Sequence, residues 1–100
     1  MRTVIVTRMT VEWDVNADSE DGMVTAEMSA PCAFATMDEA RADIEGALKT
    51  EYLEEGRYVI RDIVRCPHDG GWSVTVWYNG GRTEFRATEI KLKQDEYINS

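Results

Sequence analysis

The sequence predicts a two-layer α+β domain, in which one amphipathic helix packs on one face of an antiparallel β-sheet in the order ββαβββ. Only residues 36–56 carry apolar side chains at helical spacing, whereas the segments on either side alternate apolar and polar residues as strands do. A chain of 100 residues with 43% hydrophobic residues suits a single core. The predicted parts of this domain are a β-hairpin (1–34), the helix (36–56), a three-stranded meander (57–93) and a tail (94–100).

The predicted helix has recognisable ends. Thr36 and Glu39 have the spacing of a capping box, in which each side chain can bond the backbone N–H of the other residue. Gly56 is placed to end the helix in a left-handed conformation. Between these ends, one arc carries the apolar residues Met37, Ala40, Ile44, Ala47, Leu48 and Tyr52. The expected buried contacts join Met37, Ile44 and Leu48 to Trp72, Val74, Val76 and Phe85.

Residues 3–15 and 23–34 alternate apolar and polar side chains, which predicts the two strands of a hairpin. The apolar residues have odd numbers in the first strand and even numbers in the second. If both sets face the core, the residue numbers of each opposed pair must add up to an odd sum. A sum of 37 sets Glu12 opposite Thr25, whereas 39 would oppose the like charges of Glu12 and Glu27, so we favour 37. The side chains expected to face inward are Ile5, Thr7, Met9, Val11, Trp13 and Val15, then Val24, Ala26, Met28, Ala30 and Cys32.

Residues 57–92 predict three more strands joined by short turns. Asn79-Gly80-Gly81 is typical of a tight hairpin turn whose two central residues both need positive φ. Asp62 interrupts the apolar phase of its strand, which indicates a β-bulge. The side chains expected to face inward are Tyr58, Ile60, Val64 and Cys66, then Trp72, Val74, Val76 and Tyr78, then Phe85 and Ala87. The opposite face then gathers Arg57, Arg61, Arg65, Trp77, Arg82 and Arg86 with Ile63 and Thr75.

The charge is unevenly distributed along the chain. The formal net charge is −8, which opposes unaided binding to DNA or to anionic lipid. Residues 1–55 hold four basic and thirteen acidic residues, a net of −9, and residues 56–100 hold seven basic and six acidic residues, a net of +1. The acid is therefore concentrated in the predicted hairpin and helix.

The sequence predicts no catalytic or cofactor site. His68 is the only histidine, and no nucleophile and orienting partner are arranged around it. Cys32 and Cys66 lack the spacing of zinc ligands and are expected to be buried free thiols, with a bond between them left open if they are neighbours. We therefore expect neither an enzyme nor a bound metal or cofactor.

The sequence also bears on the compartment. No apolar run approaches 18 residues, and the N-terminus lacks the features of a secretory signal. Two cysteines do not make a disulfide framework. We therefore expect a protein of the reducing cytoplasm that does not span a membrane.

Two surfaces are candidate binding sites. The first is an acidic surface that would imitate nucleic acid and occupy the basic nucleic-acid-binding site of a larger protein. Its residues are Glu12, Asp14, Asp18, Glu20, Asp21, Glu27, Asp38, Glu39, Asp43 and Glu45. The alternative is a nucleic-acid-binding module in which Trp77 stacks on a base. Its residues are Arg57, Arg61, Arg65, Trp77, Arg82 and Arg86. The net charge disfavours this alternative, and the sequence leaves open whether the chain forms a homodimer.

In size, acidic charge and α+β architecture, the chain resembles the small phage proteins that disable host defences, anti-CRISPR proteins among them. The resemblance covers the whole chain and is one of size, charge and architecture, since that class has no common motif. It implies a non-catalytic inhibitor that binds a larger protein.

Residues 14–22 alternate oxygen-bearing side chains as calcium loops do, but the sixth position is Ser19 rather than glycine and the twelfth is Thr25 rather than glutamate. Without a bidentate carboxylate at its end, such a loop supplies too few ligands. We predict that calorimetric titration will detect no calcium binding in the sub-millimolar range. Binding in that range would contradict this assignment.

Overall fold

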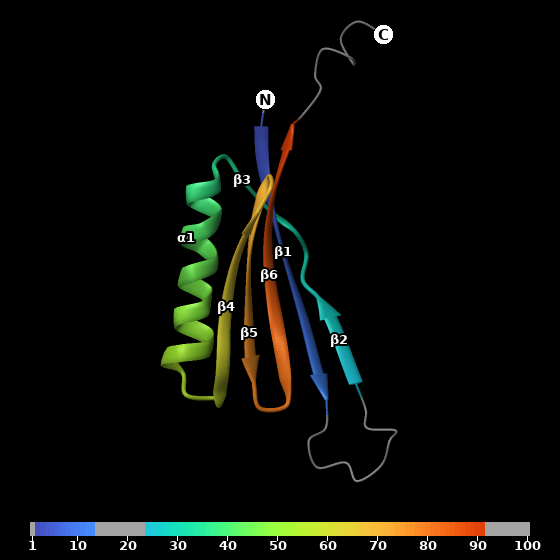
Figure 1. The fold of residues 1–100 in the computed structure, drawn as a ribbon, viewed down its shortest axis with the longest axis vertical. Coiled ribbons are helices and arrows are strands. Elements are labelled where there is room, and N and C mark those ends of the chain that lie inside the picture. The colour runs from blue at the N-terminus through green and yellow to red at the C-terminus, as the bar shows by residue number, and fades with distance from the viewer. Residues whose placement is uncertain (1, 14–23, 92–100) are drawn as a thin grey trace, which may run out of the picture.

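The structure is a computed structural model, and it describes residues 2–13 and 24–91 of the chain. Within these residues, the strands are β1 (Arg2–Trp13), β2 (Val24–Met28), β3 (Cys32–Phe34), β4 (Ile60–His68), β5 (Gly71–Tyr78) and β6 (Gly81–Lys91). The helix α1 (Met37–Ala47) continues directly as the π-helical segment η1 (Leu48–Glu54). Figure 1 shows the helix on one side of the sheet. The predicted α+β fold is therefore confirmed.

All strand pairs in the sheet are antiparallel. The strand order is β2-β1-β6-β5-β4, and β3 also pairs with β1, next to β2 along the same edge. The predicted meander of β4, β5 and β6 is present. The long pairing of β1 with β6 joins this meander to the N-terminal hairpin and makes one continuous sheet (Figure 1).

The helix has the predicted start and end. The Thr36 hydroxyl accepts a hydrogen bond of 3.2 Å from the backbone N–H of Glu39, as an N-cap does. Gly56, which follows the C-cap, has a φ of +68°, a conformation that favours glycine. The change to π-helical geometry at Leu48 was not expected from the sequence.

The apolar stripe of the helix packs on the meander as predicted. Its four buried members are Ala40, Ile44, Leu48 and Tyr52. The sheet contributes Val4, Val6, Trp72, Val74, Val76, Tyr78, Phe85 and Ala87 to the same core, and Met37 and Ala47 pack against it at the edge. The inward face predicted for β5 and β6 is therefore confirmed.

The hairpin has the predicted register but is not a simple pair of strands. Glu12 lies opposite Thr25, so the favoured sum of 37 is confirmed. The predicted second strand is split, because three residues, 29–31, stand opposite the two residues 7–8 of β1. The residue numbers of each pair therefore add up to 38 in β3, where Phe34 pairs with Val4. This single extra residue places Phe34 on the helix side of the sheet and Met28 on the opposite side.

The face predicted for the first strand was wrong. Val4 and Val6 are buried against the helix, whereas the expected inward residues from Ile5 to Trp13 face away from it. Val24, Ala26 and Met28 of β2 pair with these residues and also face away, so the inward face predicted for the second strand was wrong too. Arg8 and Thr10 also lie on the helix side of β1, where their polar groups form hydrogen bonds with other side chains. Arg8 lies 4.7 Å from the centre of the Phe85 ring and forms two hydrogen bonds, of 3.0 and 2.9 Å, with Glu51. A charged side chain can therefore occupy the edge of the core.

The predicted bulge at Asp62 is confirmed, because the register of β4 on β5 shifts between Ile60 and Asp62. The shift reverses the faces of the rest of β4. Ile63 and Arg65 lie on the helix side, and Val64 and Cys66 lie on the other, so the prediction that Val64 and Cys66 point inward was wrong. Both cysteines are free and exposed rather than buried.

The turn between β5 and β6 is tight, as predicted, but only one of its central residues has a left-handed conformation. Gly80 has a φ of +91°, and no described residue other than glycine has a positive φ. Asn79 therefore does not adopt the conformation expected for it. Its backbone N–H instead donates a 2.9 Å hydrogen bond to the carbonyl oxygen of Val59.

A cluster of hydroxyl groups lies in the core around Thr83, which is fully buried. The Tyr52 hydroxyl donates to the Thr83 hydroxyl at 2.8 Å. The hydroxyls of Thr10 and Tyr78 lie 3.1 and 3.2 Å from the same oxygen. A threonine oxygen can take part in three hydrogen bonds, so these polar groups satisfy one another within an otherwise apolar layer.

We predict that Leu48→Ala lowers the free energy of unfolding by about 2–5 kcal/mol, because lost contacts and a cavity both contribute. Leu48 is 1% exposed. Leu53→Ala is the matched control, since Leu53 is 51% exposed and should change stability by less than about 1 kcal/mol. Urea melts measure both values. A decrease in the free energy of unfolding of less than about half a kcal/mol for Leu48→Ala would contradict the burial of this helix face.

We predict a loss of stability at alkaline pH from Tyr52 and Tyr78. Burial raises the pKa of both phenols in the folded protein. The stabilisation is fully present below the unfolded-state pKa of about 10 and is lost as the pH rises through the higher folded-state pKa values. Urea melts on either side of about pH 10 measure this loss, and Tyr52→Phe should reduce it. Equal pH dependence in Tyr52→Phe and the unsubstituted protein would contradict the prediction.

Candidate functional site

The sheet has two chemically different sides. The helix covers one of them, and we call the other the outer face. Strand pairing places the following described side chains on the outer face: Thr3, Ile5, Thr7, Met9, Val11 and Trp13 on β1; Val24, Ala26 and Met28 on β2; Ala33 on β3; Asp62, Val64, Cys66 and His68 on β4; Ser73, Thr75 and Trp77 on β5; and Arg82, Glu84, Arg86, Thr88 and Ile90 on β6.

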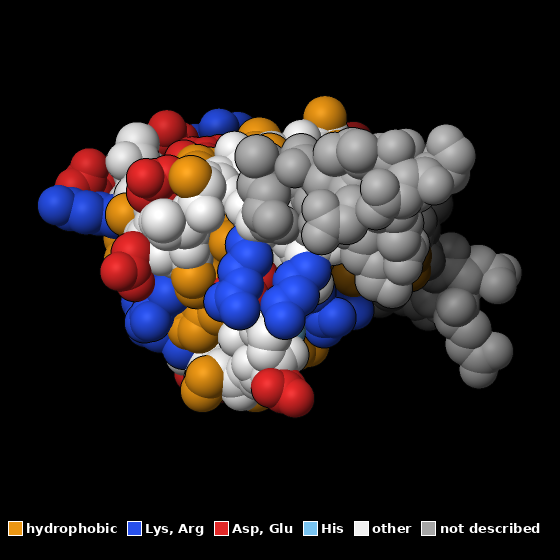
Figure 2. All heavy atoms as spheres, turned by 90° about the horizontal axis from the view of Figure 1, so that it is seen from above, with side chains coloured by type: hydrophobic (Ala, Val, Ile, Leu, Met, Phe, Trp, Pro, Cys, Tyr) orange, Lys and Arg blue, Asp and Glu red, His pale blue; other side chains and the backbone are white. Residues whose placement is uncertain are grey.

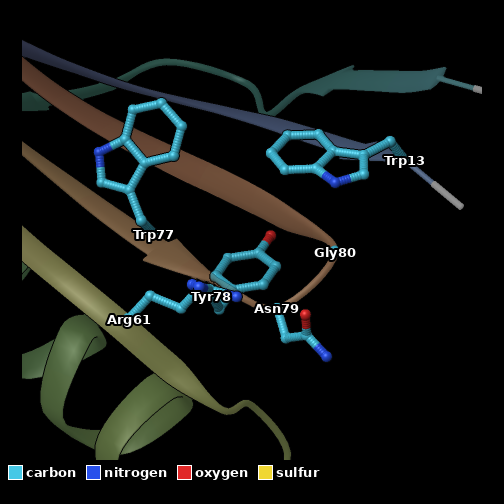
Figure 3. A pocket seen from close by; sticks show the side chains of 6 residues that line it. All are labelled: Trp13, Arg61, Trp77, Tyr78, Asn79 and Gly80. Atoms are coloured by element: carbon cyan, nitrogen blue, oxygen red, sulfur yellow. The ribbon is translucent and has the colours of Figure 1, made fainter. Parts of the chain in front are cut away.

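A pocket of about 290 Å³ lies at the end of the sheet, beside the β5–β6 turn. Figure 3 shows the indoles of Trp13 and Trp77 standing apart above Tyr78, with Arg61 and Asn79 below them. The Trp13 backbone N–H donates a 2.9 Å hydrogen bond to the carbonyl oxygen of Gly80, which fixes the end of β1 against the turn. Each indole is 38% exposed. The pocket therefore offers aromatic surface together with one guanidinium and one carboxamide.

The arginines predicted for the outer face are dispersed. Arg65 lies on the helix side and binds Glu45 through two hydrogen bonds of 2.7 and 2.9 Å, so its placement was predicted wrongly. Arg57 precedes β4 and lies 3.7 Å from Glu55. Three arginines stay close to the predicted site: Arg61 in the pocket, Arg82 at 5.5 Å from the centre of the Trp77 ring, and Arg86 at 3.2 Å from Glu84.

The described residues of the predicted acidic surface all lie on the helix side. Asp38, Glu39 and Asp43 are exposed on α1, and Glu12 and Glu27 project from the helix side of β1 and β2. Figure 1 shows α1 and β2 at opposite sides of the view, so these acids form two groups rather than one continuous patch. Asp14, Asp18, Glu20 and Asp21, and with them the calcium-like loop, lie outside the described residues.

Glu45 is the one member of this set that forms an ion pair with another described residue. The hydrogen bonds from Arg65 lower the pKa of Glu45. The arginine therefore neutralises Glu45 on the flank of the helix, and the acidic character of the helix comes mainly from its first two turns.

Most basic side chains of the described residues are occupied within the protein. Arg2, Arg8, Lys49, Arg57, Arg65 and Arg86 each lie within 4 Å of a carboxylate. Arg41 lies 4.7 Å from the centre of the Trp72 ring, and Arg82 lies 5.5 Å from the centre of the Trp77 ring. In Figure 2, Asp and Glu side chains lie at the left of the view, on the side where Figure 1 places α1, with Lys and Arg side chains among them, and a group of Lys and Arg side chains lies below the centre. The charge left without an internal partner is therefore mainly negative.

Among the described residues, no three His, Cys, Asp or Glu side chains come together in a way that could hold a metal ion. No helix in this part of the chain is long and apolar enough to cross a membrane. Comparison of the chain with protein-family models, with curated proteins and with solved structures gives no match.

Sequence reasoning missed that Trp13 and Trp77 line the same pocket. Trp13 was assigned to the inward phase of its strand, and its position beside the β5–β6 turn depends on the long pairing of β1 with β6. The one available signal was the alternation of apolar and polar residues from Met9 to Trp13, which puts Met9, Val11 and Trp13 on a single face but does not say which layer covers it.

Proposed function

We propose that this protein is a non-catalytic binding protein that inhibits a larger partner by occupying its basic nucleic-acid-binding site. The observation that carries this proposal is the division of charge just described. Basic side chains are mostly bonded or stacked within the molecule, whereas Asp38, Glu39, Asp43, Glu12 and Glu27 are exposed and form no ion pair with another described residue.

Such an arrangement favours a basic partner. Exposed carboxylates create a negative potential that speeds the approach of a positively charged site and orients the two molecules. Opposite charge contributes to association rate more than to affinity, and aromatic anchors usually contribute most of the affinity. A phage anti-defence protein that blocks a CRISPR effector would combine these properties, and the cytoplasm is where it would act.

A second candidate is a nucleic-acid-binding module, which the contact of Arg82 with Trp77 favours. The dispersal of the arginines weakens it, because Arg65 is turned to the helix side and Arg57 and Arg86 contact carboxylates. Only Arg61, Trp77 and Arg82 remain together near the pocket. Together with the net charge of −8, this leaves little positive surface for a polyanion.

The test begins with capture from a bacterial lysate on immobilised protein, followed by mass spectrometry and nucleic-acid staining. The proposal expects a nucleic-acid-binding enzyme among the retained proteins. Retained RNA without such an enzyme would favour the second candidate instead.

The deciding measurement compares two charge reversals by surface plasmon resonance on the captured enzyme. Glu27→Lys with Asp43→Lys should slow association on the order of tenfold at low salt, since steering depends on these charges. Arg61→Glu with Arg82→Glu is the matched control and should change the rate much less. Neither Glu27 nor Asp43 lies in the first helical turn or forms an ion pair with a basic side chain of the described residues. Both substitutions should therefore leave the fold intact. The proposal fails if the arginine pair abolishes binding and the acidic pair leaves it unchanged.

A further inference from the structure

The outer face is a large sheet surface that the helix leaves uncovered. Figure 1 shows α1 on one side of the sheet, and the described core lies entirely between the helix and the sheet. Taking about 3.3 Å per residue and about 4.8 Å between strands, β1, β2, β4, β5 and β6 present roughly 700 Å² on each face. Stable interfaces between proteins bury about 800 Å² on each partner, so this face is of suitable size.

The outer face is also where the exposed apolar side chains are found. Of the eight large hydrophobic side chains exposed in the described residues, six lie on it: Trp13, Val24, Met28, Val64, Trp77 and Ile90. The two others, Leu53 and Val59, lie on η1 and before β4. The half-buried residues Ile5, Met9 and Val11 continue the apolar surface along β1. The apolar side chains of β1 and β2 form a strip along one edge of the outer face, and polar residues of β6 and β5 separate this strip from Val64 on β4. An exposed apolar strip with a polar surround is typical of an interaction site.

The charge of the outer face identifies its occupant. With Arg61, which lines the pocket beside Trp13 and Trp77, its described residues carry the three cations Arg61, Arg82 and Arg86 and the two anions Glu84 and Asp62, a formal charge of +1. Every described member of the acidic surface is on the helix side. Two copies of a chain with a charge of −8 repel one another in most orientations, but contact between outer faces brings together surfaces of small net charge and turns both helix sides away.

The central strand adds a self-complementary pattern. Along β6, the outer face reads Arg82, Glu84, Arg86, with alternating sign. A two-fold axis level with residue 83 or 85 brings two such rows together antiparallel and sets Glu84 of each copy opposite an arginine of the other. A basic partner would meet only one anion of this row and two arginines, so the pattern favours a second copy.

We propose that two copies of this chain associate through their outer faces and form a symmetric two-sheet sandwich with both helices on the outside. Aligned sheets pack about 10 Å apart with interdigitated side chains, and Trp13 and Trp77 would supply the aromatic anchors at the ends of the interface. The dimer presents two acidic sides in opposite directions. This inference does not depend on the proposed inhibitory function, because the protein dimerises without any partner.

Analytical ultracentrifugation tests the proposal with the purified full chain. At high concentration the protein should sediment with twice the 11.4 kDa mass of one chain, and it should dissociate on dilution. Met28→Glu with Val64→Glu should raise the dimer dissociation constant at least about tenfold, because the interface would bury unpaired charges. Leu53→Glu is the matched control, since it adds a carboxylate at an exposed apolar position off the outer face, and it should leave the dimer intact.

A second measurement uses the unsubstituted protein and so does not depend on how variants fold. Cys66 lies on the outer face and Cys32 on the helix side, and both are exposed in the single chain. Alkylation followed by mass spectrometry should label both thiols in dilute protein, whereas at high concentration Cys66 should react more slowly than Cys32. A monomer at every concentration, equal labelling of the two thiols in the dimer, or a dimer unaffected by Met28→Glu with Val64→Glu overturns the proposal.

Discussion

The packing of one helix on one sheet is the constraint from which the two-sided character of this protein follows. The buried stripe from Ala40 to Tyr52 covers the meander residues Val74, Val76 and Phe85. A single helix can shield only one face of a sheet, and no helix of the described residues covers the other face. The apolar residues that the strands place there are consequently a surface property of the molecule and contribute nothing to the core beneath the helix.

Single-residue insertions decide which side chains reach which face. Side chains alternate along a strand, so one extra residue reverses every position beyond it. The extra residue at 29–31 turns Phe34 toward the core, and the bulge before Asp62 turns Arg65 toward the helix. Arg65 then reaches Glu45, and this ion pair removes both charges from the surfaces where the sequence placed them. Backbone register thus controls the charge distribution as well as the packing.

The helix, the meander, the register of the first hairpin and the bulge were predictable because each has a local signal. Thr36, Gly56, Gly80 and Asp62 are residues whose chemistry marks a cap, a turn or an interruption. The face of β1 was not predictable. Apolar residues occur in both of its phases, and the choice depends on partners distant in sequence, such as Glu51 for Arg8 and Thr83 for Thr10. Alternation shows that residues share a face, but the covering layer is a property of the whole fold.

The same limitation applied to the candidate sites. The six residues predicted for the outer face, from Arg57 to Arg86, suggested a basic surface. The sequence alone could not show that several of these arginines form ion pairs within the protein. Once each charged side chain is placed, more carboxylates than basic side chains are left without an ion pair among the described residues. A surface is defined by the charge that remains after internal pairing, because paired ions produce little field at a distance. By that measure the helix side is acidic, whereas the outer face carries little net charge and most of the exposed large apolar side chains, and the two sides suit different kinds of partner.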